Sequence, residues 1–132
     1  MATKTNHSKR PLSPHLQIYR LPMTAKMSIS HRLTGVVLAL GTVLLTAWLV
    51  AAAMGEDSYN SAMTFAQGPL GKIILVGWSL ALYYHLCNGI RHLFWDAGLL
   101  LSESSAKISG WIVILLTLIL TMMTWLCSCT FF

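Results

Sequence analysis

Residues 33–55 read LTGVVLALGTVLLTAWLVAAAMG, a run of 23 positions without a charged side chain. A helix rises about 1.5 Å per residue, so roughly 20 apolar residues cross the hydrocarbon core of a membrane. Two further charge-free runs qualify, 18 residues from 73 to 90 and 25 residues from 108 to 132. The chain is therefore predicted to be an all-α membrane protein whose three transmembrane helices lie near 27–54, 69–97 and 107–130.

The composition of the 132-residue chain supports this fold class. Hydrophobic residues make up 55% of the chain and charged residues 10%, against roughly 25% charged residues in soluble domains. So few charged side chains cannot form the surface of a soluble domain, which excludes most classes of soluble enzyme. Cys87, Cys127 and Cys129 lie in or at the end of apolar runs, so we expect buried thiols rather than a metal site.

Charge asymmetry predicts the orientation of the chain in the membrane. Six of the nine Lys and Arg residues precede Leu33, whereas Glu56 and Asp57 lie in the first connection. The positive-inside rule places the N-terminus in the cytoplasm or mitochondrial matrix and the C-terminus outside. We interpret the basic end as a topology signal, with no nucleic-acid partner. Residues 1–26 then form a cytoplasmic N-terminal segment, and 27–132 form the three-helix anchor domain.

Small and hydroxyl side chains form stripes on the first and third predicted helices. Such stripes let helices approach closely and hydrogen-bond. We favour packing seams, shared with partner helices, over a transport path, because a transporter needs a carboxylate within the membrane and Asp96 and Glu103 lie at its inner edge. The stripes comprise Ser28, Arg32, Gly35, Ala39, Thr42 and Thr46 on the first helix, and Gly110, Thr117, Thr121, Thr124 and Ser128 on the third.

The second predicted helix carries a histidine deep in the membrane. His85 shares a face with Gly89 and His92, and ionisable groups at such depth are usually functional. His85 either hydrogen-bonds a neighbouring helix or ligates a metal or haem. His92 stands about 10 Å further along the axis, so the two cannot hold one haem iron. Any second ligand is expected from another chain.

The surroundings of such a haem can also be predicted. His31 lies at the inner end of the first helix, and we expect it near the depth of His92 rather than of His85. We expect a cationic ring for the haem propionates, formed by His31, Arg32, Arg91 and His92. Gly89, one turn from His85, is expected to leave room for the flat macrocycle.

Three motifs carry a resemblance to a known family. They read RPLSPHLQIY at 10–19, SISHRLTG at 28–35 and HLCNGIRHLFWD at 85–96. Together they resemble the cytochrome b556 subunits of succinate dehydrogenase, the large membrane anchors of respiratory complex II, in their alphaproteobacterial and mitochondrial form. The likeness covers roughly residues 10–126 and includes the layout of three spans.

The resemblance implies a heterotetramer with a flavoprotein, an iron–sulfur protein and a second membrane anchor, in which the two anchors share one haem b. Electrons would pass from the iron–sulfur subunit to ubiquinone, linking the tricarboxylic acid cycle to the respiratory chain. No residue of this chain would act on succinate. The implied site residues are His85 as axial ligand of the haem iron, His31, Arg32 and His92 around the propionates, and Ser28 and Arg32 at the ubiquinone.

Other implications concern the ends of the chain and its location. Asp96 also matches the family, and equally suits a helix end or a partner for an arginine. The stretch from Pro11 to Pro22 would run beneath the iron–sulfur subunit. The few residues before Arg10 are too short for a mitochondrial transit peptide, which favours a bacterial inner membrane over a mitochondrial one. The alternative function is a non-redox assembly anchor in which His85 only packs.

Overall fold

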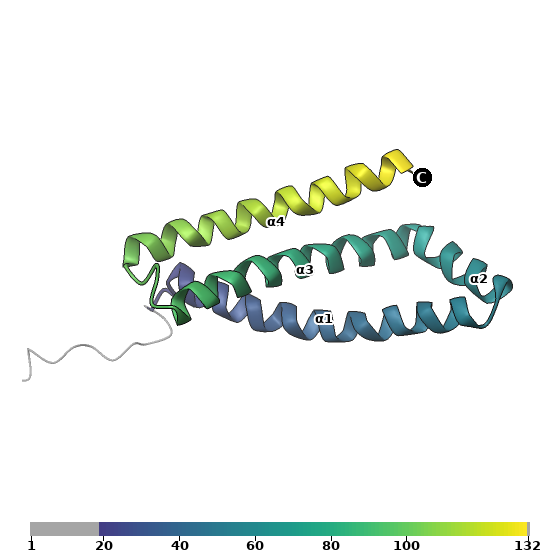
Figure 1. Cartoon of the computed structure of the whole chain (residues 1–132), viewed down its shortest axis with the longest axis horizontal. Helices are drawn as coiled ribbons and strands as arrows, with labels where there is room; N and C mark the ends of the chain where they lie inside the picture. Colours follow the sequence, from purple (N-terminus) through teal and green to yellow (C-terminus); the bar gives the residue numbers. More distant parts are fainter. Residues whose placement is uncertain (1–18, 132) are drawn as a thin grey trace, which may run out of the picture.

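The structure, a computed structural model, describes residues 19–131, with side chains described as far as Ser128. This part of the chain forms four helices, α1 (Met23–Ala53), α2 (Glu56–Gln67), α3 (Pro69–Asp96) and α4 (Glu103–Phe131) (Figure 1). Of these, α1, α3 and α4 are long and apolar enough to cross a membrane. The predicted all-α membrane fold with three spans is confirmed. The motif at 10–18 lies outside the described residues.

The described helices follow the three predicted spans but differ from them in detail. Helix α1 begins at Met23, a few residues before the predicted start near 27. The connection at 56–67 is not a loop but helix α2, and α4 begins at Glu103 rather than near 107. Helix α2 contains no glycine or proline, and its two acidic residues lie in the first turn, where they favour the helix dipole.

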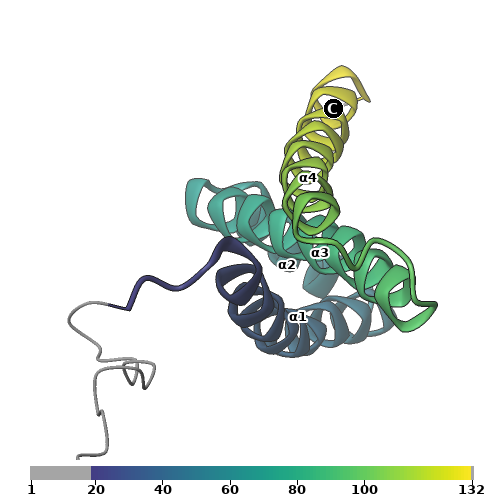
Figure 2. The same ribbon diagram turned by 90° about the vertical axis from the view of Figure 1, so that its left-hand side faces the viewer.

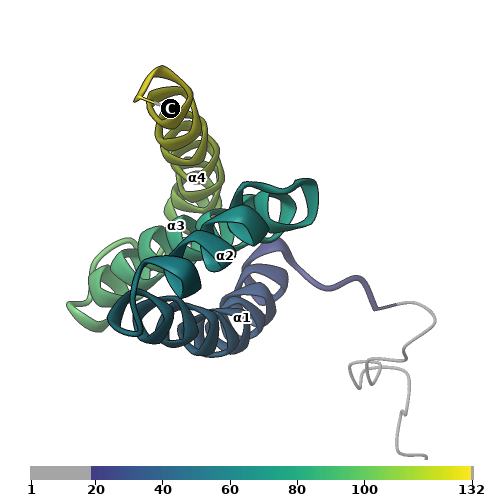
Figure 3. The ribbon, with the colours of Figure 1, turned by 90° about the vertical axis from the view of Figure 1, so that its right-hand side faces the viewer.

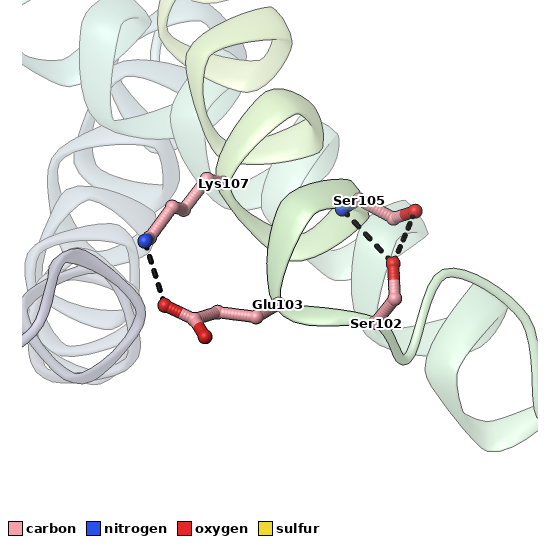
Figure 4. A network of polar contacts seen from close by, with 4 residues as sticks. All are labelled: Ser102, Glu103, Ser105 and Lys107. Carbon is pink, nitrogen blue, oxygen red and sulfur yellow. Dashed lines mark hydrogen bonds and ion pairs between the residues drawn. The ribbon is translucent and has the colours of Figure 1, made fainter.

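Polar side chains explain why α4 begins early. The backbone N–H of Ser105 donates to Ser102 Oγ at 3.2 Å, and the Ser102 hydroxyl donates to Ser105 Oγ at 2.7 Å (Figure 4). A serine that accepts from the third helical N–H is a typical N-cap. Lys107 Nζ pairs with Glu103 Oε1 at 2.7 Å across the same turn. The serines that look like a loop in the sequence therefore start the helix.

The turn from α3 to α4 depends on Gly98. The N–H of Leu99 donates to the Phe94 carbonyl at 2.8 Å, and the N–H of Gly98 donates to the Trp95 carbonyl at 2.9 Å. This pair of bonds is the Schellman motif, which needs a residue with positive φ after the helix. Gly98 supplies it with φ 77°. The chain thereby reverses within a few residues.

Helix α3 lies at the centre of the bundle and contacts each of the other three helices. Seen end-on, α4 stands out from the group formed by α1, α2 and α3 (Figures 2 and 3). The start of α1 and the α3–α4 turn lie at one end of the bundle, and α2 and the end of α4 lie at the other (Figure 1). The inner ends of α1 and α3 are therefore neighbours.

The predicted seam on α4 is confirmed for Gly110, Thr117 and Thr121, whereas Thr124 is exposed. Thr117 and Thr121 are buried, and each hydroxyl donates to the carbonyl four residues earlier. Gly110 is buried against Met23 and Met27 of α1, because a Cβ there would lie 2.8 Å from Met27 Sδ. Small and self-bonded hydroxyl side chains thus allow α4 to approach its neighbours.

The predicted seam on α1 is only partly correct. Gly35 lies against α3, but Ala39, Thr42 and Thr46 are exposed. Further along α1, the indole of Trp78 lies directly over Gly41 and leaves no space for a Cβ. The face of α1 that meets α3 is rotated away from the predicted stripe.

Candidate functional site

Three imidazoles lie together between α1 and α3, toward the end of the bundle where α1 begins. We call His31, His85 and His92 the imidazole cluster. The rings of His31 and His85 are stacked, with centroids 3.9 Å apart and an interplanar angle of 16°. The His92 ring is tilted, with its centroid 5.3 Å from that of His31. Trp95 meets His92 edge-on at 5.1 Å. The cluster extends from mid-span toward the end of α3.

The hydrogen bonds of His85 define its tautomer. Its Nδ1 lies 3.1 Å from the His31 carbonyl oxygen and 3.2 Å from Thr34 Oγ1. The Thr34 hydroxyl donates to the same carbonyl at 2.8 Å, so both neighbours of Nδ1 act as acceptors. The proton therefore sits on Nδ1, which leaves a lone pair on Nε2. No hydrogen bond from the described residues reaches Nε2.

The position predicted for His31 is wrong. Its ring lies closer to His85 than to His92, because the side chain reaches from α1 across to α3. The ring of His31 borders the space predicted beside Gly89, since a Cβ on Gly89 would make an ordinary contact of 3.7 Å with His31 Cε1. His31 Nδ1 is buried and has no hydrogen-bond partner in the described part of the chain. Such an atom is costly unless another group meets it.

The predicted cationic ring does not include Arg91. Its guanidinium points to α4, where Nε donates to Ser109 Oγ at 2.9 Å and Nη2 donates to the Ala106 carbonyl at 2.8 Å. Six residues separate Arg91 from His85, which is about 240° around a helix. The two side chains therefore serve different faces of α3.

The remaining predicted site residues lie at the inner ends of the helices. Ser28 is half-buried on α1. Arg32, one turn later, is exposed and makes no hydrogen bond or ion pair with a described residue. Asp96 is likewise exposed at the end of α3, and no described residue forms an ion pair with it. The alternative of Asp96 pairing with an arginine is not seen within residues 19–131.

The imidazole cluster fits one side of a haem. A neutral imidazole with a free Nε2 and a hydrogen-bonded Nδ1–H is the state that ligates iron. His31 and His85 cannot hold the same iron from opposite sides, because their rings are stacked almost parallel. The unpartnered Nδ1 of His31 suits a polar group of a bound molecule. The chain thus offers one ligand and a polar surround.

Two residues that contact His85 were not predicted as site residues. Thr34 contacts Nδ1, and a Cβ on Gly35 would lie 3.2 Å from Cε1 of the ring. The signal was present, because both residues follow His31 in the motif SISHRLTG. Their spacing of three and four residues places them on the face of His31.

Comparison with known proteins agrees with this architecture. The family model described as succinate dehydrogenase/fumarate reductase transmembrane subunit matches residues 6–124. A relative from Rickettsia felis, named succinate dehydrogenase cytochrome b556 subunit, is 44% identical over 126 residues, covering 93% of this chain and 98% of its own length.

Two further relatives extend the range of the family. The subunit of the same name from Paracoccus denitrificans is 46% identical over 119 residues, covering 90% of this chain and 92% of its own length. A succinate dehydrogenase cytochrome b560 subunit from Reclinomonas americana is 38% identical over 122 residues, covering 89% and 85%. The chain belongs to the family of transmembrane subunits of succinate dehydrogenase and fumarate reductase.

Proposed function

We propose that this chain is the haem b- and ubiquinone-binding membrane anchor of a succinate:quinone oxidoreductase. It passes electrons from an iron–sulfur subunit to ubiquinone and takes no part in succinate chemistry. Its partners are the flavoprotein, the iron–sulfur protein and a second membrane anchor, which shares the haem. The observation that carries the proposal is the surroundings of His85, an imidazole within a candidate span whose Nδ1 lies against the His31 carbonyl and Thr34, while no described residue bonds its Nε2.

The haem, when bound, supplies a one-electron carrier within the membrane. His85 holds the iron through Nε2, while the His31 carbonyl and Thr34 keep the proton on Nδ1. His31, Arg32 and His92 surround the propionates, and the unpartnered Nδ1 of His31 supports this role. A second ligand comes from the partner anchor, since the stacked rings exclude His31.

Ser28 and Arg32 form the proposed ubiquinone site. They lie one helical turn apart on α1, near the N-terminal end of this helix, which follows the basic N-terminal segment. A quinone that gains electrons develops negative charge on its carbonyl oxygens, which a hydroxyl and a guanidinium stabilise. The exposed Arg32 has no partner among the described residues, so its donors are available. An Arg32 that only reaches the lipid headgroups would give Ser28 no role.

The chain lies in a bacterial inner membrane with its N-terminus in the cytoplasm, or in a mitochondrial inner membrane with its N-terminus in the matrix. Three spans and the excess of Lys and Arg before Leu33 support this orientation. A reporter active only after export, fused after Phe132, should be active. An inactive export reporter together with an active cytoplasmic one would contradict the orientation.

A second function also has an observation in its favour. The ring of His85 stacks on His31, and its Nδ1 bonds the His31 carbonyl of α1. A packed histidine of this kind suits a non-redox assembly anchor.

The spectrum of the purified complex separates these two functions. Low-spin haem b is expected to give an absorbance band at about 560 nm in the reduced-minus-oxidised spectrum. His85→Leu should abolish or strongly shift this band. His92→Leu is the companion variant: it removes an imidazole placed beside the propionates but not the proposed iron ligand, so the low-spin band should weaken rather than be abolished. An unchanged low-spin spectrum in His85→Leu would refute the ligand.

The quinone site is tested by Arg32→Leu. Loss of one charge-assisted hydrogen bond in the transition state costs ~1.5–3 kcal/mol, a decrease of roughly 10- to 150-fold in rate. Succinate-driven quinone reduction should fall by this factor, whereas succinate oxidation with an artificial acceptor at the flavin persists. Lys72→Leu, which removes an exposed charge from the far end of α3, should keep both activities. Near-normal quinone reduction in an assembled Arg32→Leu complex would contradict the assignment.

A further inference from the structure

Two residues of the motif SISHRLTG contact His85 and are not themselves proposed to bind the haem or the quinone. Thr34 and Gly35 are half-buried on α1 and face His85 on α3. Their position beside the proposed iron ligand suggests that they act on the ligand.

Thr34 completes a closed triangle of hydrogen bonds around one edge of His85. Its hydroxyl donates to the His31 carbonyl, and its oxygen then accepts from Nδ1 of His85, which also contacts that carbonyl. The direction of the Thr34 bond matters here. Because its one proton is committed to the carbonyl at 2.8 Å, the oxygen at 3.2 Å from Nδ1 is an acceptor.

Gly35 controls how closely the ring approaches α1. A Cβ at this position would lie 3.2 Å from Cε1 of His85, tighter than an ordinary contact, so the ring would have to shift by a few tenths of an ångström. The His31 ring covers one face of the same imidazole at 3.9 Å. The ring of His85 is thus held at its Nδ1 edge, at Cε1 and on one face.

We propose that Thr34 and Gly35 are positioning residues that set the orientation and the electron donation of His85 toward a haem iron. The inference rests on the proposed function and deepens it. A ligand imidazole whose second N–H is hydrogen-bonded is oriented and is a stronger donor to the metal. The triangle with the His31 carbonyl fixes the tautomer, and Gly35 fixes the approach.

The first experiment compares Thr34→Val with Thr34→Ser in the intact, purified complex. Valine keeps the volume of threonine but removes the acceptor oxygen, so Nδ1–H keeps only the carbonyl. Loss of such a second partner typically weakens metal affinity by roughly 10- to 100-fold. We expect the rate at which Thr34→Val loses haem to excess apomyoglobin to increase by up to this factor. Its haem midpoint potential should rise, because a poorer donor stabilises the oxidised iron less. Thr34→Ser should behave as the wild type.

Two matched controls separate this role from general packing. Thr42 also donates its hydroxyl to a carbonyl three residues earlier on α1, at 2.6 Å, but it is exposed and touches no histidine. Thr42→Val should leave the potential unchanged. Gly35→Ala should shift the low-spin electron paramagnetic resonance signal, whereas Gly89→Ala, whose Cβ would make an ordinary 3.7 Å contact with His31, should not.

The outcomes distinguish this inference from the proposed function. If the wild-type complex lacks a b-type haem, or if His85→Leu retains it unchanged, the proposed function fails and this inference fails with it. If His85→Leu loses the haem but Thr34→Val keeps the wild-type potential and haem-loss rate, only this inference is overturned. Should Thr34→Val not assemble, a wild-type potential and resonance signal in Gly35→Ala overturns it.

Discussion

The two faces of α3 treat their polar side chains in opposite ways. Toward α4, Arg91 is only 3% exposed, yet each of its guanidinium nitrogens donates, to Ser109, Asn88 and Ala106. Its guanidinium also lies 4.0 Å from the centre of the Trp95 ring. Toward α1, by contrast, the buried Nδ1 of His31 has no partner among the described residues, and Nε2 of His85 accepts no hydrogen bond from them.

This difference indicates which face is structural. A buried polar network that is almost complete rigidifies the fold, whereas unpartnered buried atoms mark a place where another molecule belongs. Asn88 is fully buried and its Nδ2 is the exception on the α4 side. Arg91 joins α3 to α4, whereas the imidazole cluster is the site at which we propose that the haem binds. Three substitutions test this division, and their expected effects on stability decrease in order.

The largest effect is expected from Arg91→Leu. The change leaves Asn88 Oδ1 without its donor and removes the contact with Trp95, which together cost about 2–5 kcal/mol. The thermal unfolding midpoint of the detergent-solubilised complex should fall clearly, and less complex should accumulate in membranes. Arg32→Leu is the matched control, because it removes an exposed arginine from the other face. Equal destabilisation by both variants would contradict the division of α3 into two faces.

An intermediate effect is expected from Gly41→Ala. The new methyl group has no space beneath the Trp78 indole, and such overpacking typically costs about 1–3 kcal/mol. Gly77→Ala, on α3 in open space, should be neutral or gain up to ~1 kcal/mol of helix propensity. The unfolding midpoint of Gly41→Ala should therefore fall, whereas that of Gly77→Ala should stay unchanged or rise. A stable Gly41→Ala complex would show that the outer half of the α1–α3 contact is loosely packed.

The smallest effect is expected from Lys107→Met. Lys107 and Glu103 form an ion pair at 2.7 Å, but both side chains are exposed. Water and salt screen an exposed pair of this kind, which therefore contributes little to stability, so the unfolding midpoint should change little. Glu103→Gln is the companion variant and should match it. A fall as large as that of Arg91→Leu would mean that charge pairing, and not burial, stabilises the α3–α4 hairpin.

Much of the fold could be predicted from the sequence, because the spans depend on local composition. A charge-free run long enough to cross the hydrocarbon core is a property of consecutive residues. The seam on α4 could be predicted for the same reason, since threonines at helical spacing fall on one face. Helix α2 was missed because its polar composition resembles a connection, and only its lack of glycine and proline pointed to a helix.

The same distinction, between features set along one helix and contacts between helices, applies to the candidate site. The depth of His85 follows from its position in a charge-free run, and even the separation of Arg91 from the cluster follows from its angle on the helix. The contacts of His85 with His31, Thr34 and Gly35 do not follow in this way. They depend on how α1 is rotated and shifted along its axis against α3.

The sequence by itself therefore determined the three candidate spans, their polar faces and the place of His85 within a charge-free run, because each is set by neighbours along one helix. Only the tertiary structure decided that His31 stacks on His85 and that the Thr34 hydroxyl oxygen accepts a hydrogen bond from Nδ1 of His85. Those contacts join residues more than 50 positions apart. They exist because the close approach of α1 and α3, permitted at Gly35 and Gly41, fixes one helix register among several that the sequence pattern allows.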